Sequence, residues 1–114
     1  MPHFIIDCTE NVLKMQEPQV VLEAVFEAAF STGLFVRNDI KVRLNPFVHS
    51  LVQGADDDFI HVFGNIKEGR NGKQKAALSK VIVSKLNSMF LDVPIISMNS
   101  RDFTKESYYN KTMM

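Results

Sequence analysis

The chain of 114 residues has no tryptophan, one cysteine, five glycines and four prolines, and its formal net charge is zero. With Cys8 alone, no disulfide can form within the chain, which is typical of a reducing compartment. Thirteen basic residues balance thirteen acidic ones, so no overall field favours nucleic acid or a membrane surface. We see neither a signal peptide nor an apolar run of about 18 residues. These absences predict a cytoplasmic protein that binds neither nucleic acid nor membrane.

Alternating and helical periodicities predict four strands and two long helices. The strands are expected at residues 3–8, 40–44, 59–66 and 95–98. One helix should begin at Pro18 and end before Gly33, which suits the left-handed conformation just past a last turn. The second should run from about Lys73 to Phe90. Residues 45–58 carry Pro46, Gly54 and three consecutive aspartates, which predict a loop.

This order of elements predicts a single α/β (α+β) domain over residues 1–114. Two βαβ units, at about residues 2–53 and 59–98, should form a four-stranded sheet with both helices on one face, followed by a C-terminal tail at 100–114. The strands of each unit should be parallel. The same order also suits a non-catalytic ferredoxin-like module for ligand binding or oligomerisation, in which the strands pair antiparallel. The uncovered sheet face predicts a homo-oligomer.

Pro2 directly precedes the first strand, and methionine is usually trimmed before a small second residue. Removal of Met1 would leave a prolyl secondary amine at the edge of the sheet. Such an amine is a useful general base when an apolar pocket or neighbouring cations bring its pKa near the working pH. Alternatively, Pro2 is only a residue that the terminus tolerates. If Met1 is retained, Pro2 is an amide without a basic lone pair.

Lys41 and Arg43 alternate with apolar residues and should share one face of the second strand. Two like charges side by side are unfavourable without an anion, although a solvated face explains them equally well. Cys8 is expected to be a small buried side chain, and His61 a packed or surface histidine. Three consecutive aspartates point in different directions, so the run at residues 56–58 predicts a solvated turn and no metal site.

Four segments together resemble the 5-carboxymethyl-2-hydroxymuconate delta-isomerase family of the tautomerase superfamily. They are Met-Pro-His-Phe-Ile-Ile-Asp-Cys at residues 1–8, Thr-Gly-Leu-Phe at 32–35, Ile-Lys-Val-Arg at 40–43 and Lys-Glu-Gly-Arg at 67–70. The resemblance covers nearly the whole chain. It implies a trimer of tautomerase-like subunits without a cofactor, with active sites around the terminal proline at or near subunit boundaries. The implied substrate is a small unsaturated carboxylate from the catabolism of aromatic compounds.

The same resemblance implies roles for individual residues. Pro2 matches the family's catalytic proline, which moves a proton between the dienol and enone forms. Arg70 matches an arginine that binds a substrate carboxylate or polarises the 2-oxygen. Lys41 stands where the family's other substrate-binding arginine is expected, and lysine lacks the planar fork that grips a carboxylate. Two interpretations follow: Arg43 takes over that role, or the substrate is a different enol.

Overall fold

Strand β1 (His3–Thr9) lies at the centre of the fold, and its side chains alternate between two environments. In the computed structural model, which describes residues 1–114, Phe4, Ile6 and Cys8 are fully buried. His3, Ile5 and Asp7 point to the opposite face and are half-buried. This period of two is the one that the sequence pattern predicts.

The four strands form one mixed sheet in the order β2-β1-β3-β4. β2 (Lys41–Phe47) pairs parallel with β1, and β4 (Ile95–Phe103) pairs parallel with β3 (Phe59–Lys67). The two halves meet where β1 and β3 pair antiparallel. The predicted parallel pair within each half is therefore confirmed. The antiparallel ferredoxin-like sheet is excluded.

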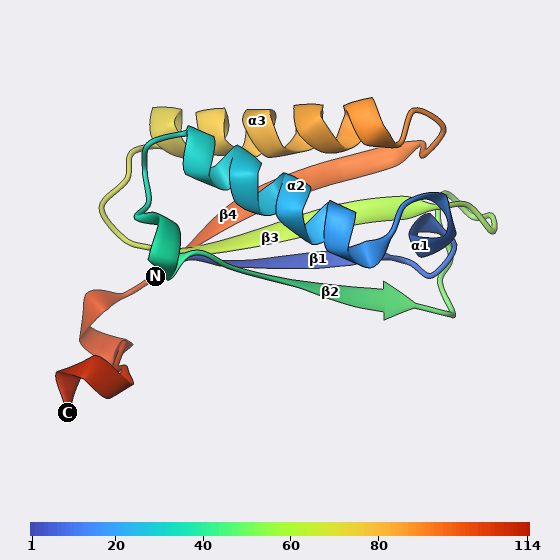
Figure 1. Cartoon of the computed structure of the whole chain (residues 1–114). Helices are drawn as coiled ribbons and strands as arrows, with labels where there is room; N and C mark the ends of the chain where they lie inside the picture. The colour runs from blue at the N-terminus through green and yellow to red at the C-terminus, as the bar shows by residue number, and fades with distance from the viewer.

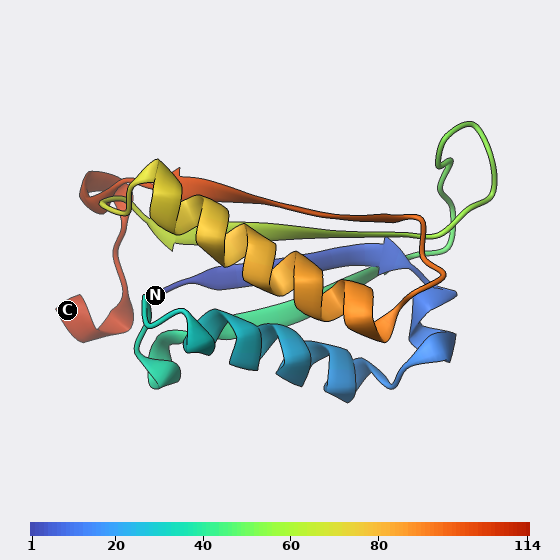
Figure 2. The same cartoon turned by 90° about the horizontal axis from the view of Figure 1, so that it is seen from above.

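Helices α2 (Pro18–Ser31) and α3 (Gly72–Met89) lie side by side on one face of the sheet (Figures 1 and 2), as predicted. Each buries a row of apolar side chains against the strands, namely Val21, Val25 and Ala29 from α2 and Leu78, Ile82 and Leu86 from α3. Two aromatic residues of α2 are less deeply placed: Phe26 is half-buried against the core and Phe30 is exposed. A short helix, α1 (Val12–Met15), fills a segment that the sequence left unassigned.

Two strands extend beyond their predicted ends. β2 continues through Pro46 to Phe47, so residues 45–47 are strand and not loop. Proline is tolerated there because β2 is an edge strand whose outer side needs no N–H donor. β4 runs to Phe103 because it stays paired with the full length of β3, in register from Phe59 to Lys67. The predicted tail therefore starts after β4 and contains two 3₁₀ turns, at 105–107 and 111–113.

No helix covers the other face of the sheet (Figure 1), as predicted. Apolar and polar side chains are mixed on it: the register places Ile5 beside Phe63, and Asp7 beside His61. His61 lies 2.6 Å from Ser97 Oγ and 2.7 Å from Asn99 Oδ1. His61 is thus a packed strand histidine with polar partners. None of the helices combines the length and the hydrophobicity that a membrane-spanning helix needs.

Candidate active site

The start of β1 lies at one end of the sheet, beside the start of β2 and the end of β3. Pro2 is buried, and its carbonyl accepts a hydrogen bond of 3.1 Å from the backbone N–H of Lys41. The α-amine of Met1 lies 3.8 Å from the carboxylate of Asp39, in the 3₁₀ turn Arg37–Asp39 that precedes β2. With Met1 in place, the nitrogen of Pro2 is an amide. The hydrogen bond to β2 and the burial of its ring hold Pro2 at this end of the sheet.

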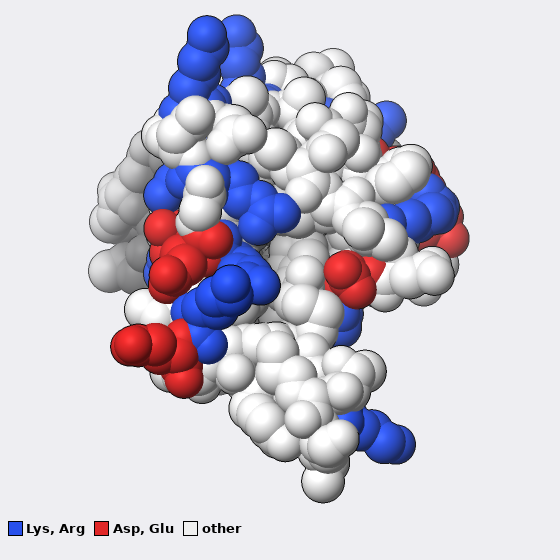
Figure 3. Space-filling view, turned by 90° about the vertical axis from the view of Figure 1, so that its left-hand side faces the viewer, with Lys and Arg blue, Asp and Glu red and all other residues white.

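A pocket of about 780 Å³ opens directly beside Met1. Its walls come from the chain start, the turn before β2, the β3–α3 loop and the tail; the lining residues are Met1, Asp39, Lys67, Glu68, Gly69, Arg70, Gln74 and Lys105. Its volume is that of an ordinary small-molecule site, about 300–1,000 Å³. Three of its side chains are cations and two are anions. Figure 3 shows this end, with Lys and Arg side chains gathered around a smaller acidic group.

Arg70 is held in place before any ligand binds. Its Nη2 donates to the carbonyl of Leu34 at 2.7 Å, and its Nη1 donates to the carbonyl of Lys67 at 3.4 Å. The guanidinium lies 5.1 Å from the centroid of the Phe35 ring, which packs edge-on against Phe4. Two of the five guanidinium N–H groups are thereby occupied, and the others remain available to an anion. A rigid, partly satisfied arginine of this kind suits carboxylate binding.

The α-amine of Met1 responds to the charges around it. Burial lowers its pKa below the ordinary value, and Lys41, Arg70 and Lys67 lower it further, while Asp39 opposes them. Desolvation and nearby cations both favour the neutral amine. An amine at this position is therefore closer to its basic form at neutral pH than an ordinary chain terminus.

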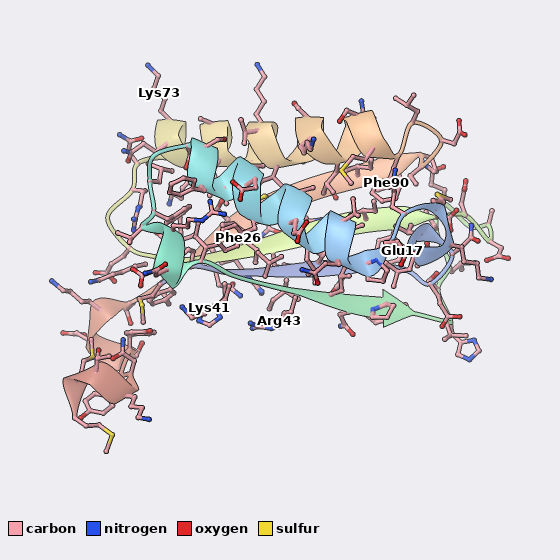
Figure 4. All side chains as sticks on the ribbon, viewed as in Figure 1. Glu17, Phe26, Lys41, Arg43, Lys73 and Phe90 are labelled. Atoms are coloured by element: carbon pink, nitrogen blue, oxygen red, sulfur yellow. The ribbon has the colours of Figure 1, made fainter.

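The predicted residues lie at different distances from this pocket. Arg70 lines it, and Pro2 lies buried beneath Met1. The Nζ of Lys41 donates to the carbonyl of Asp39 at 2.6 Å, and Lys41 lines the neighbouring groove between α2 and β2. Arg43 does not line the pocket, and its Nη1 lies 3.2 Å from Nδ1 of His3. Both cations project from the side of β2 that faces away from the helices (Figure 4).

Asp39, Lys67 and Lys105 line the pocket, although they were not among the site residues expected from the sequence. Asp39 and Lys67 lie next to strand ends, where charged residues are usually solvated. Lys105 belongs to the tail. The backbone N–H of Lys105 donates to the carboxylate of Glu68 at 3.2 Å, which ties the start of the tail to the β3–α3 loop. The proximity of Lys67 and Arg70 in the sequence was the one available signal. Elsewhere, no group of three or more His, Cys, Asp or Glu side chains converges.

Two βαβ units in one mixed sheet, with a cationic pocket at the start of β1, define a tautomerase-like protein. The family model for 5-carboxymethyl-2-hydroxymuconate isomerase matches residues 2–112. The chain belongs to this family, and it is an isomerase of the tautomerase superfamily. The resemblance, fold class and enzyme class predicted from the sequence are confirmed.

Solved structures share the fold at low sequence identity. A 5-carboxymethyl-2-hydroxymuconate isomerase from Deinococcus radiodurans R1 is 18% identical, with a TM-score of 0.82 over 96% of this chain and 88% of that chain. A symmetric trimer of wild-type fused 4-OT is 16% identical, with a TM-score of 0.81 over 96% and 93%. N1, a member of the cis-3-chloroacrylic acid dehalogenase family, is 16% identical, with a TM-score of 0.76 over 96% and 80%. No curated protein matches the chain by sequence.

Proposed function

We propose that this isomerase ketonises 5-carboxymethyl-2-hydroxymuconate or a related 2-hydroxydienoate carboxylate, with the amine of Pro2 as general base after removal of Met1. The observation that carries the proposal is the pre-positioned Arg70 in a cationic pocket beside the start of β1. The family match supports the reaction class. Burial and nearby cations lower the pKa of the Met1 amine, and the Pro2 amine, which removal of Met1 would expose one residue further on, is expected to respond to the same cations.

The reaction moves one proton from oxygen to carbon. The neutral prolyl amine removes the proton of the 2-hydroxyl group and, as an ammonium, delivers a proton to a carbon of the diene, so the amine is regenerated. Negative charge collects meanwhile on the 2-oxygen and the adjacent carboxylate. Arg70 binds these oxygens through its free N–H groups and stabilises that charge. Lys41 adds a positive charge near the amine and helps to keep it neutral.

The protein is proposed to work as a homotrimer, as the sequence resemblance implies. The uncovered sheet face, which carries Ile5 and Phe63 among polar side chains, is a surface that an oligomer can bury. The fused 4-OT with the same fold is a trimer. Light scattering at several protein concentrations measures the assembly, and a monomer at all of them refutes it.

The test of function is an ultraviolet ketonisation assay with 5-carboxymethyl-2-hydroxymuconate, on protein whose intact mass shows that Met1 is absent. Fast conversion that Pro2→Ala abolishes establishes the base. Protein that retains Met1 is the matched control, because its Pro2 nitrogen is an amide, and it should be inactive. Conversion by Pro2→Ala at the wild-type rate refutes the assignment of Pro2.

A second substrate class is supported by one observation. Lysine at position 41, tied to the carbonyl of Asp39, does not offer the two-pronged grip of an arginine. A different enol, such as the enol of phenylpyruvate, then becomes the candidate. Comparing kcat/KM for enols with one, two and three carboxylates decides between the two classes.

A further inference from the structure

The pocket contains a cation to which the proposed mechanism gives no role. Lys67 is the last residue of β3, it is half-buried, and its side chain lines the pocket beside Met1 and Arg70. The backbone carbonyl of Lys67 lies 3.4 Å from Arg70 Nη1, which places the backbone of Lys67 next to the guanidinium. The Nζ of Lys67 has no hydrogen bond and no ion pair, since the chain's ion pairs involve only Met1 with Asp39, Arg37 with Glu27, and Lys75 with Asp102.

The other cations near this end of the sheet differ from Lys67 in their contacts or in their exposure. The Nζ of Lys41 donates to a backbone carbonyl, and Arg43 lies against His3. Lys105 lines the same pocket but is exposed and comes from the tail. Lys67 is fixed to a strand, and side chains on strands hold a ligand more accurately than those on loops.

A half-buried ammonium without a hydrogen-bond partner is unfavourable, and the same pocket also holds the positive charge of Arg70. The two acidic residues of the pocket do not supply that partner to Lys67. Asp39 lies against the Met1 amine, and the carboxylate of Glu68 accepts from the backbone of the tail. A carboxylate that enters the pocket would accept a charge-assisted hydrogen bond from the free Lys67 ammonium.

We infer that Lys67 is a specificity-determining residue of this site, whose ammonium binds a second carboxylate of the substrate while Arg70 holds the carboxylate next to the reacting oxygen. The inference rests on the proposed function, because it assumes that the enol reacts beside Pro2. It selects enols with at least two carboxylates over those with one. Lys67 and Arg70 come from the same subunit, so both carboxylates are bound by one chain.

Lys67 also contributes to the field at the amine. The charged groups that face the Met1 amine are Asp39 from the turn before β2, Lys41 from β2, Lys67 from β3 and Arg70 from the following loop, with Glu68 and Lys105 on the pocket wall. Lys67 is one of the three cations that lower its pKa. Loss of that charge raises the pKa of an amine at this place, so the acid limb of kcat/KM moves to higher pH.

The experiment compares Lys67→Gln and Lys67→Arg with wild type, on protein without Met1. Lys73→Gln is the matched control, since Lys73 lies on the first turn of α3, is exposed, and points away from the sheet (Figure 4). The probes are the enol of phenylpyruvate, with one carboxylate, 2-hydroxymuconate, with two, and 5-carboxymethyl-2-hydroxymuconate, with three. Circular dichroism confirms that each variant is folded.

Lys67→Gln should raise KM for the two multiply charged substrates by about 10-fold to 150-fold, the effect of one lost hydrogen bond to a charged group. KM for the monocarboxylate should change less than about twofold on the same physical argument, because Arg70 alone binds its carboxylate. Lys67→Arg should restore most of the affinity for the multiply charged substrates. Lys73→Gln should leave KM unchanged for all three substrates. The acid limb should move to higher pH in Lys67→Gln only.

An equal rise in KM for all three substrates overturns the inference, since it shows a general effect on the site or the fold and no selection by carboxylate number. Unchanged KM values in Lys67→Gln overturn it as well. The proposed function fails in a separate way, namely when wild-type protein without Met1 converts none of the three enols.

Discussion

Replacement of Arg70 by alanine tests whether the residue that the proposed mechanism needs also holds the site together. The substitution removes the donor to Leu34 O at 2.7 Å, the long contact to Lys67 O at 3.4 Å and the guanidinium over the Phe35 ring. A hydrogen bond from a charged group contributes about 1.5–3 kcal/mol, and a cation–π contact about 0.5–1 kcal/mol. The 3.4 Å contact is too long to add much. We therefore expect the free energy of unfolding to fall by about 2–4 kcal/mol.

Urea unfolding followed by circular dichroism measures this loss. All samples need the same protomer concentration, because association contributes to apparent stability. Arg70→Lys is the informative companion: it keeps the charge but cannot donate to both carbonyls, so its stability should lie between those of wild type and Arg70→Ala. On the proposed function, kcat/KM of Arg70→Ala falls by about 10-fold to 150-fold, the equivalent of one charged hydrogen bond. A free energy of unfolding within about 0.5 kcal/mol of wild type, as at ordinary surface sites, refutes the structural argument.

Three further predictions concern other parts of the chain. Lys41→Arg should leave KM within about twofold of wild type, because the Nζ of Lys41 is tied to the carbonyl of Asp39 and Lys41 itself does not line the pocket. Burial, with a smaller effect of the nearby Asp7 carboxylate, raises the pKa of the Cys8 thiol to about 11; thiol labelling at pH 8 should therefore be slow in native protein and fast in urea. A Cβ at Gly64 would lie 2.8 Å from Met98 Cε, the flexible end of its side chain, and 3.3 Å from the fully buried ring of Phe4, so Gly64→Ala should lower the free energy of unfolding by about 1 kcal/mol.

Each of these has a contradicting outcome. A clearly lower KM in Lys41→Arg shows that position 41 contacts the substrate. Fast labelling of native protein at pH 8 shows that Cys8 is accessible. For Gly64, the control is Gly72→Ala, where an added Cβ meets nothing within 4 Å; equal losses in both variants rule out the close contact as the cause. The raised pKa of Cys8 also makes stability depend on pH. Above the pKa of the unfolded thiol, unfolding releases a proton that the folded thiol keeps. The free energy of unfolding therefore declines as pH rises toward about 11.

The sequence predicted the parts of the fold that rest on local periodicity. Alternation in residues 3–8 and the four-residue repeats of both helices reflect burial on one side, which the sheet and its single helical layer provide. It missed the extensions of β2 and β4 because these depend on the partner strand. Pro46 and Arg101 look like loop residues locally, but both are in register with β-strand neighbours, Cys8 and Asn65 respectively.

Prediction of the site was limited in the same way. Pro2 and Arg70 came from a motif resemblance, and their roles remain predictions. Asp39, Lys67 and Lys105 come from three separate segments, and only the tertiary structure brings them to one pocket. Alternation placed Lys41 and Arg43 on one face, but it does not show that hydrogen bonds already engage both side chains.

The antiparallel pairing of β1 with β3 relates the two halves of the chain by an approximate two-fold axis. The position before β1 is held by Pro2, and the equivalent position before β3, at the opposite end of the sheet, is held by Asp58, whose carboxylate accepts from Thr9 and Asn11. One end of the sheet thus gathers lysine and arginine, while the other carries the aspartates of residues 56–58. The zero net charge hides an electrical polarity along the strands. An approaching polyanion is drawn to one end and repelled by the other, so the duplicated architecture offers it a single entrance.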